Sequence, residues 1–166
     1  MSSGPLVFAD QNGLTIDHKS HTIRLTRYFD APRAHVFDAW TRAERVKCWW
    51  DPAGVPLLTC EIDLRPGGSF KFVSKGHEEM PFAGTYSEVI PPDRLVFEAM
   101  GATGRVILQE EKSKTQMLVE IQCRSAEHLA QFLKIGVDKG TSQTLDNLVA
   151  YISRPDTPYA RVERAR

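Results

Sequence analysis

The sequence predicts an α+β domain in which a curved antiparallel sheet packs against one long C-terminal helix. Two short helical segments follow the first strand, about six alternating segments occupy residues 55–122, and a helical stripe covers residues 126–152. Strands joined by short turns pair antiparallel, and a sheet with one apolar face buries that face against another layer. We therefore expect a sheet of about seven strands that curls around the last helix.

The first strand and the two short helices lie at the start of this domain. Residues 23–29 alternate and are rich in β-forming side chains, which predicts a strand. Residues 30–32, Asp-Ala-Pro, are typical of a helix start, and the apolar spacing after them predicts a helix that ends near Thr41. A second short helix is predicted over residues 43–49.

Turn residues divide the strand region into hairpins. Arg-Pro-Gly-Gly at residues 65–68 and Pro-Pro-Asp at residues 91–93 are typical turn sequences. The charged residues 110–114 fit a solvated tip of the last hairpin. These turns are short, so consecutive strands are expected to be neighbours in the sheet.

The long helix is predicted to run without interruption over residues 126–152, with Ser125 as its N-cap. Gly136 and Gly140 fall on its packing stripe, although a glycine inside a helix costs about 1 kcal/mol relative to alanine. Two explanations stay open. The glycines either clear space for a ligand beneath the helix, or they allow a close approach of helix to sheet with the space already filled.

The segments outside the domain are an N-terminal extension, residues 1–21, and a C-terminal tail, residues 154–166, on either side of a domain at 22–153. An Asn-Gly pair at residues 12 and 13 predicts a small extra hairpin within the extension. The tail follows a Pro that stops the helix, and we expect it to be frayed.

Composition narrows the class of protein. The chain has 166 residues, which is typical of one domain, and its 21 basic and 21 acidic residues leave no net charge. A neutral domain lacks the basic surface of a nucleic-acid binder, and no apolar run approaches the roughly 18 residues of a membrane span. Three cysteines without a CxxC pair argue against a zinc site. No secretory signal is visible, so we expect a cytoplasmic protein.

Several motifs together resemble the activator of heat shock protein 90 ATPase homologue-like (AHSA-type) group of the START/Bet v-like SRPBCC superfamily. The resemblance covers about residues 22–153, and it implies a helix-grip fold with a cavity between sheet and helix. Members often carry a tryptophan directly after the second helical glycine, where this chain has Thr141. The motifs that carry the resemblance lie at residues 29–32, 36–41, 49–50, 63–68, 84–86, 91–97, 136, 140 and 143–148.

Aromatic and small residues on the predicted inner faces are the candidates for lining such a cavity. Adjacent helical residues point about 100° apart, so one tryptophan of a pair faces inward while the other lies near the rim. Each aromatic is equally compatible with plain core packing, and Tyr86 adds a hydroxyl that seeks a partner when buried. The candidate ligand-binding residues are Trp49, Trp50, Phe72, Tyr86, Phe97, Phe132, Gly136 and Gly140.

Catalytic signals are few. Glu88 is the one candidate base, provided that it shares the inward face of Gly84 and Tyr86. No phosphate-binding loop, nucleophile elbow or HExxH pattern occurs, so no cofactor and no metal are expected.

The sequence therefore predicts binding of a small apolar or aromatic ligand, without a defined catalytic activity. Two alternatives stay open: a co-chaperone-like domain that stimulates the heat shock protein 90 ATPase, and a polyketide cyclase or hydrolase-like enzyme. The expected partners are the small ligand and, for the first alternative, a chaperone, with neither nucleic acid nor membrane. Both a monomer and a homodimer are compatible with the sequence.

Overall fold

The computed structural model describes residues 13–154 together with residues 157 and 159, and it shows four helices and eight strands in this part of the chain. The elements, in chain order, are β1 (Leu14–Asp17), β2 (Thr22–Phe29), α1 (Arg33–Thr41), α2 (Ala43–Trp49), β3 (Thr59–Ile62), β4 (Ser69–Val73), β5 (Phe82–Ile90), β6 (Arg94–Ala99), β7 (Ala102–Glu111), β8 (Lys114–Gln122), α3 (Ala126–Lys134) and α4 (Val137–Ser153).

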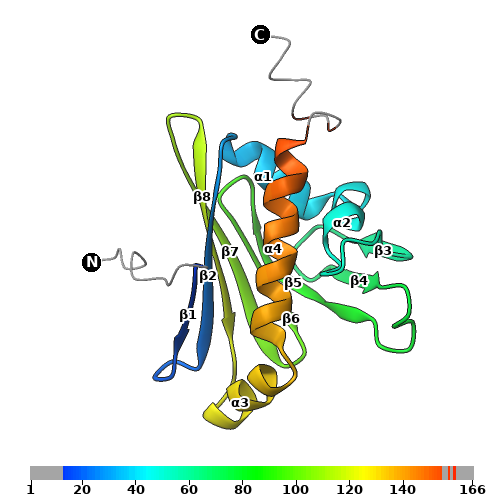
Figure 1. Cartoon of the computed structure of the whole chain (residues 1–166), viewed down its shortest axis with the longest axis vertical. Helices are drawn as coiled ribbons and strands as arrows, with labels where there is room; N and C mark the ends of the chain where they lie inside the picture. Colours follow the sequence, from blue (N-terminus) through cyan, green and yellow to red (C-terminus); the bar gives the residue numbers. More distant parts are fainter. Residues whose placement is uncertain (1–12, 155–156, 158, 160–166) are drawn as a thin grey trace.

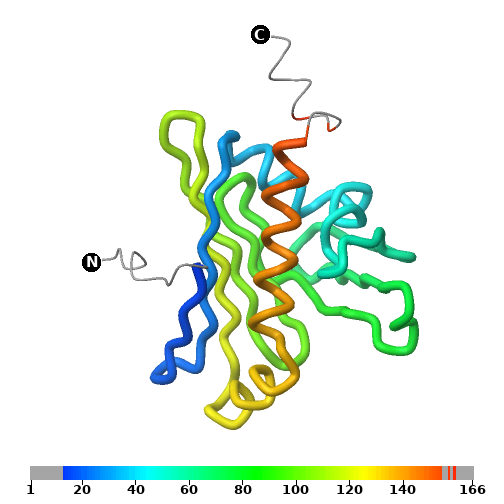
Figure 2. Tube along the Cα trace, in the orientation of Figure 1, coloured from blue at the N-terminus to red at the C-terminus, as the bar shows by residue number. Residues whose placement is uncertain are grey.

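All eight strands belong to one antiparallel sheet with the order β1-β2-β8-β7-β6-β5-β4-β3. The helices α1 and α2 carry the chain from β2 to the opposite edge of the sheet, and the following strands then return one hairpin at a time. As a result β2 pairs with the last strand, β8 (Figure 2). The sheet curves around α4, which crosses its inner face (Figure 1). This arrangement confirms the predicted α+β helix-grip fold.

The core lies between the inner face of the sheet and α4. Alternate residues of the central strands point toward the helix, as the period of two in a strand requires. Removal of this apolar area from water is the main stabilising contribution to such a layer. Fully or almost fully buried examples are Ile23 and Leu25 on β2, Met117 and Val119 on β8, and Leu145 and Leu148 on α4.

One buried cation holds α4 against the sheet. Arg27 lies on the inner face of β2, and its Nε donates to Asp146 Oδ1 at 2.9 Å. Its Nη2 donates to Ser142 Oγ at 2.7 Å. Hydrogen bonds between charged groups of this kind fix geometry as well as adding stability. Arg27 therefore fixes the position of α4, the helix that covers the cavity described below.

The N-terminal strand joins the main sheet. Leu14 in β1 lies opposite Leu25 in β2, and the hairpin between these strands turns at residues 18–21. The extra hairpin that the sequence predicts would need residues before Asn12, and these lie outside the described residues. Among the described residues the sheet already includes β1, which lies before the predicted domain boundary at residue 22.

The predicted long helix is wrong in one respect, because it is broken into α3 and α4. Ser125 caps α3 as predicted, with its Oγ accepting from the His128 N–H at 3.1 Å. Gly136, which we expected inside a helix, stands between the two helices with a φ of 83°. Glycine adopts this left-handed conformation without the penalty of a Cβ, and it commonly ends helices in this way. The helical periodicity on both sides of Gly136 concealed the break.

Two described residues of the C-terminal tail are packed rather than frayed. Thr157 and Tyr159 are both buried. The Tyr159 hydroxyl donates to Asp38 Oδ2 in α1 at 2.8 Å, and its ring lies near those of His35 and Tyr151. The expectation of a frayed tail is therefore wrong at these positions.

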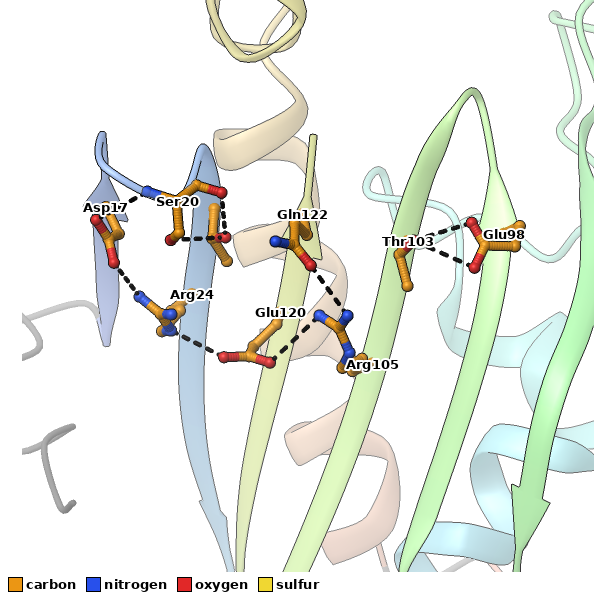
Figure 3. Close-up of polar contacts among 9 residues, drawn as sticks. Asp17, Ser20, Arg24, Glu98, Thr103, Arg105, Glu120 and Gln122 are labelled. Atoms are coloured by element: carbon orange, nitrogen blue, oxygen red, sulfur yellow. Dashed lines mark hydrogen bonds and ion pairs between the residues drawn. The ribbon is translucent and has the colours of Figure 1, made fainter. Parts of the chain in front are cut away.

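The outer face of the sheet carries a polar network that crosses four strands (Figure 3). Arg24 on β2 bonds to Asp17 Oδ2 at 3.1 Å and to Glu120 Oε2 at 2.8 Å. Arg105 on β7 bonds to Gln122 Oε1 at 2.9 Å and lies 3.7 Å from Glu120. The bond from Arg24 lowers the pKa of Asp17 to about 2. The charged groups of this network therefore form ion pairs and hydrogen bonds with one another.

None of the described helices combines the length and the apolar character that crossing a bilayer requires.

Candidate functional site

A cavity of about 240 Å³ lies between α4 and the inner face of the sheet; we call it the main cavity. Its wall is apolar, and it is formed by the end of α1–α2, by β5 to β8 and by both C-terminal helices. The lining side chains are Trp40, Trp50, Pro52, Phe82, Phe97, Ala99, Met100, Ala102, Gly104, Val119, Ile121, Phe132, Val137, Gly140, Thr141, Thr144 and Leu145.

The helix α4 leaves space over the cavity because its facing residues are small. Gly140 lies on the wall, and a Cβ added there would meet no atom within 4 Å. Thr141 follows it on the same wall, at the position where the resemblance leads us to expect a tryptophan. Threonine is much smaller than tryptophan, so this departure coincides with open space. The space beside Gly140 is therefore open.

Gly136 has a different role from the one we predicted. It does not line the main cavity, and its positive φ accounts for the glycine without reference to any ligand. Its effect on the site is indirect, because the turn that it permits directs Phe132 and Val137, from the two helices, to the same wall.

The tryptophan pair divides between core and cavity. Trp49 is 1% exposed, and its Nε1 donates to the Ala39 carbonyl at 3.2 Å, so it is a core residue. Trp50 lies on the cavity wall, and its carbonyl accepts from Thr144 Oγ1 of α4 at 2.9 Å. The prediction that adjacent tryptophans face different surroundings is consistent with this placement, but Trp49 does not reach the cavity.

Phe97 covers the floor of the cavity because β7 has a glycine beneath its ring. Gly104 lies directly opposite Phe97, and a Cβ at Gly104 would be 2.5 Å from ring atoms of Phe97. The aromatic ring therefore lies flat across the neighbouring strand. Gly104 was not among the residues that we singled out, although a glycine within an alternating strand indicates such a close approach.

A second, much smaller space adjoins the main cavity; we call it the side cavity. Its volume is about 10 Å³, and it shares Trp40, Trp50, Phe82 and Phe97 with the main cavity. The rest of its wall consists of Phe70, Phe72, Tyr86 and Leu95.

Tyr86 is buried at this side cavity, with 4% of its surface exposed. Its ring centroid lies 5.1 Å from that of Phe70. Burial raises the pKa of the Tyr86 phenol well above its ordinary value, so this group keeps its proton across the physiological range.

Glu88 does not face either cavity, so the expectation of an inward carboxylate is wrong. The pairing of β5 with β6 shifts between Tyr86 and Glu88, where a bulge inserts one extra residue. That residue transfers Glu88 to the outer face. There it is 47% exposed and lies 3.3 Å from Arg94 Nε. The alternation predicted from Gly84 onward holds only as far as the bulge.

The walls of both cavities lack charge. None of the described residues that line them is acidic or basic, and their hydroxyls belong to Thr141, Thr144 and Tyr86. Across residues 13–154, 157 and 159 we find no group of three His, Cys, Asp or Glu side chains arranged to hold a metal ion. Such walls favour uncharged, apolar molecules.

Six of the eight predicted ligand-binding residues therefore line one of the two cavities, whereas Trp49 and Gly136 line neither. Trp50, Phe97, Phe132 and Gly140 line the main cavity, whereas Phe72 and Tyr86 line the side cavity. Sequence reasoning missed Phe82, Met100 and Val137, which stand in turns or at element ends.

Comparisons with known proteins agree with this architecture. A family model described as Activator of Hsp90 ATPase homolog 1-like protein matches residues 30–153. Among curated proteins, none matches the sequence.

Solved structures share the fold at low sequence identity. A protein from Arthrobacter aurescens superposes with a TM-score of 0.77 at 20% identity, over 87% of this chain and 92% of the other. A protein from Mycobacterium smegmatis has a TM-score of 0.73 at 21% identity, over 84% of this chain and 96% of the other. A protein from Nitrosomonas europaea has a TM-score of 0.72 at 22% identity, over 87% of this chain and 97% of the other. These likenesses extend to the fold alone. The family model matches most of the sequence and so identifies the family as well as the fold. The chain belongs to the family of Activator of Hsp90 ATPase homolog 1-like proteins, in the SRPBCC superfamily.

Proposed function

We propose that this protein binds a small apolar or aromatic molecule in the main cavity beneath α4. The observation that carries the proposal is the open space at Gly140, which faces a wall of aromatic and small apolar side chains. An unfilled space of this size in a core forfeits packing contacts. A ligand would restore those contacts.

The size of the cavity sets the size of the ligand. A dry apolar cavity of about 150 Å³ accepts benzene. The main cavity, at about 240 Å³, has room for a compact molecule of about two fused rings. Trp50 and Phe97 offer flat surfaces against which such rings stack.

The described groups on the cavity walls support binding rather than turnover. General acid–base catalysis needs a titratable group within hydrogen-bond reach of the substrate. The candidate for that role, Glu88, lies on the outer face. We therefore propose a binding protein without a defined catalytic activity.

Binding of naphthalene, measured by ligand-observed NMR, tests the proposal. We expect saturable binding to the unchanged protein and a loss of at least about tenfold in affinity for Gly140→Trp, because the indole would fill the space over the cavity. Lys139→Trp is the matched control, since Lys139 is the neighbouring residue of α4 and is exposed. It should bind like the unchanged protein.

Native mass spectrometry of gently purified protein complements this test by revealing a molecule retained from the host. Gly140→Trp must first be shown to unfold cooperatively, so that lost binding is not lost structure. Unaltered naphthalene affinity in a folded Gly140→Trp variant would contradict the proposed site.

A further inference from the structure

Tyr86 differs from the other buried tyrosines of the described chain in having no partner for its hydroxyl. Tyr159 donates to Asp38, and Tyr151 interacts with Arg45. No described residue forms a hydrogen bond with the hydroxyl of Tyr86, although the residue is only 4% exposed. A buried phenol normally finds a partner. The Tyr86 hydroxyl oxygen is not among the fully enclosed side-chain atoms that lack a partner, so it borders open space in which a partner can lie.

The surroundings of Tyr86 do not supply that partner. Apart from Tyr86, the side cavity is lined by aromatic side chains and Leu95. The indole N–H of Trp40 on this wall already donates to Met117 Sδ at 3.2 Å. The volume of about 10 Å³ is close to the minimum for one water, and a buried water typically needs two to four polar partners. The side cavity therefore has room for one polar atom, but this atom must be part of a molecule that is bound elsewhere.

The main cavity provides that other support. It shares Trp40, Trp50, Phe82 and Phe97 with the side cavity, so the two spaces are neighbours across a single aromatic layer. The rings of Trp50 and Phe82 are in contact, with centroids 5.1 Å apart, whereas Phe97 forms no ring contact with either of them. A substituent would therefore reach Tyr86 beside Phe97 rather than between Trp50 and Phe82. A molecule whose rings occupy the main cavity would hold an attached oxygen at Tyr86.

The chemistry of the walls also fixes the charge of that oxygen. Neither cavity has an acidic or basic residue among its described lining. A carboxylate, phosphate or ammonium group would be desolvated there without a counter-charge, at a large free-energy cost. A hydroxyl or carbonyl oxygen loses much less hydration, and the Tyr86 O–H both donates and accepts.

We propose that the ligand is a neutral molecule with an apolar body in the main cavity and one hydroxyl or carbonyl oxygen hydrogen-bonded to Tyr86. This inference rests on the proposed function and adds the chemical class of the ligand. Tyr86 is then the residue that distinguishes an oxygenated ligand from a hydrocarbon of the same shape.

Two probes of the same shape test it. 2-Naphthol and 2-methylnaphthalene differ in one substituent, a hydroxyl in place of a methyl group. We expect Tyr86→Phe to weaken 2-naphthol binding about 3- to 10-fold, as the loss of one hydrogen bond predicts, and to leave 2-methylnaphthalene binding unchanged. Tyr28→Phe is the matched control, because Tyr28 is 67% exposed on β2 and lines neither cavity. It should alter neither affinity.

The possible outcomes separate this inference from the proposed function. If both probes bind and Tyr86→Phe affects them equally, the inference is wrong and the proposed function stands. If neither probe binds the unchanged protein, both are wrong. The stability of Tyr86→Phe without ligand gives a second test: the variant should be as stable as the unchanged protein, whereas a lowered melting temperature would show that the hydroxyl already has a partner.

Discussion

The aromatic region formed by Trp40, Trp49, Phe70 and Phe72 shares one sheet face with the main cavity beneath α4, yet the two are packed in opposite ways. In the aromatic region the rings fill the layer except for the side cavity of about 10 Å³. Centroids of neighbouring pairs are about 5 Å apart there, as for Trp40 and Trp49 at 5.0 Å. In the cavity the helix contributes Gly140 and the sheet contributes Gly104.

The comparison shows how a helix-grip fold retains space inside a close-packed protein. Large side chains meet in the aromatic region, whereas in the main cavity the large side chains of the wall are accompanied by Gly140 and Thr141 of α4 and by Gly104 of β7. Arg27 fixes the position of α4 over the sheet through its hydrogen bonds to Asp146 and Ser142. The cavity is thus a property of residue size and not of the backbone alone.

Trp49→Ala should produce the largest effect, because it breaks the filled region. Trp49 is almost completely buried and donates a hydrogen bond to Ala39. We expect a loss of about 3–5 kcal/mol in the free energy of unfolding, the range for large-to-small changes of buried aromatics. Urea-induced unfolding measures it.

Trp50→Ala is the matched comparison, since this adjacent tryptophan borders the cavity and is only partly buried. Its destabilisation should be the smaller of the two. Equal losses in the two variants would mean that the cavity wall is packed as fully as the core.

Two alanine substitutions should differ in sign. Gly140→Ala adds a methyl group to open space inside a helix, and we expect it to raise the free energy of unfolding by about 0.5–1 kcal/mol. Gly104→Ala places a methyl group 2.5 Å from the ring of Phe97 and should destabilise by about 1–3 kcal/mol. Thermal unfolding of both variants checks the pair. Destabilisation by Gly140→Ala would indicate that no space exists there.

The sequence predicted the fold more completely than the site. Alternation, turn residues and family motifs were enough for the sheet and the long helix, because each is a local pattern repeated over many residues. The break at Gly136 and the bulge after Tyr86 were missed, since each depends on a single residue whose backbone conformation no periodicity reveals. That bulge alone decides the face on which Glu88 lies.

The sequence also could not predict whether the space beneath α4 is open or filled. A helical glycine is compatible with a filled or an empty space, and the distinction depends on the residue that faces it across the layers. Phe97 could have filled the space beneath Gly140, but Gly104 allows its ring to lie against the sheet instead. That Gly104 lies opposite Phe97 follows from the pairing of β6 with β7, which the sequence alone does not give.

Glu88→Gln should produce the smallest effect and sharpen the distinction between the two faces of the sheet. Glu88 and Arg94 are each about half exposed, and a solvent-screened pair of this kind contributes little, about 0–1 kcal/mol. We expect the free energy of unfolding to change by less than about 1 kcal/mol and the affinity for naphthalene to stay the same. Urea unfolding and the NMR binding assay measure the two quantities. A clear loss of affinity in a stably folded Glu88→Gln variant would contradict the outward position of this carboxylate, and it would return Glu88 to the ligand as a candidate base.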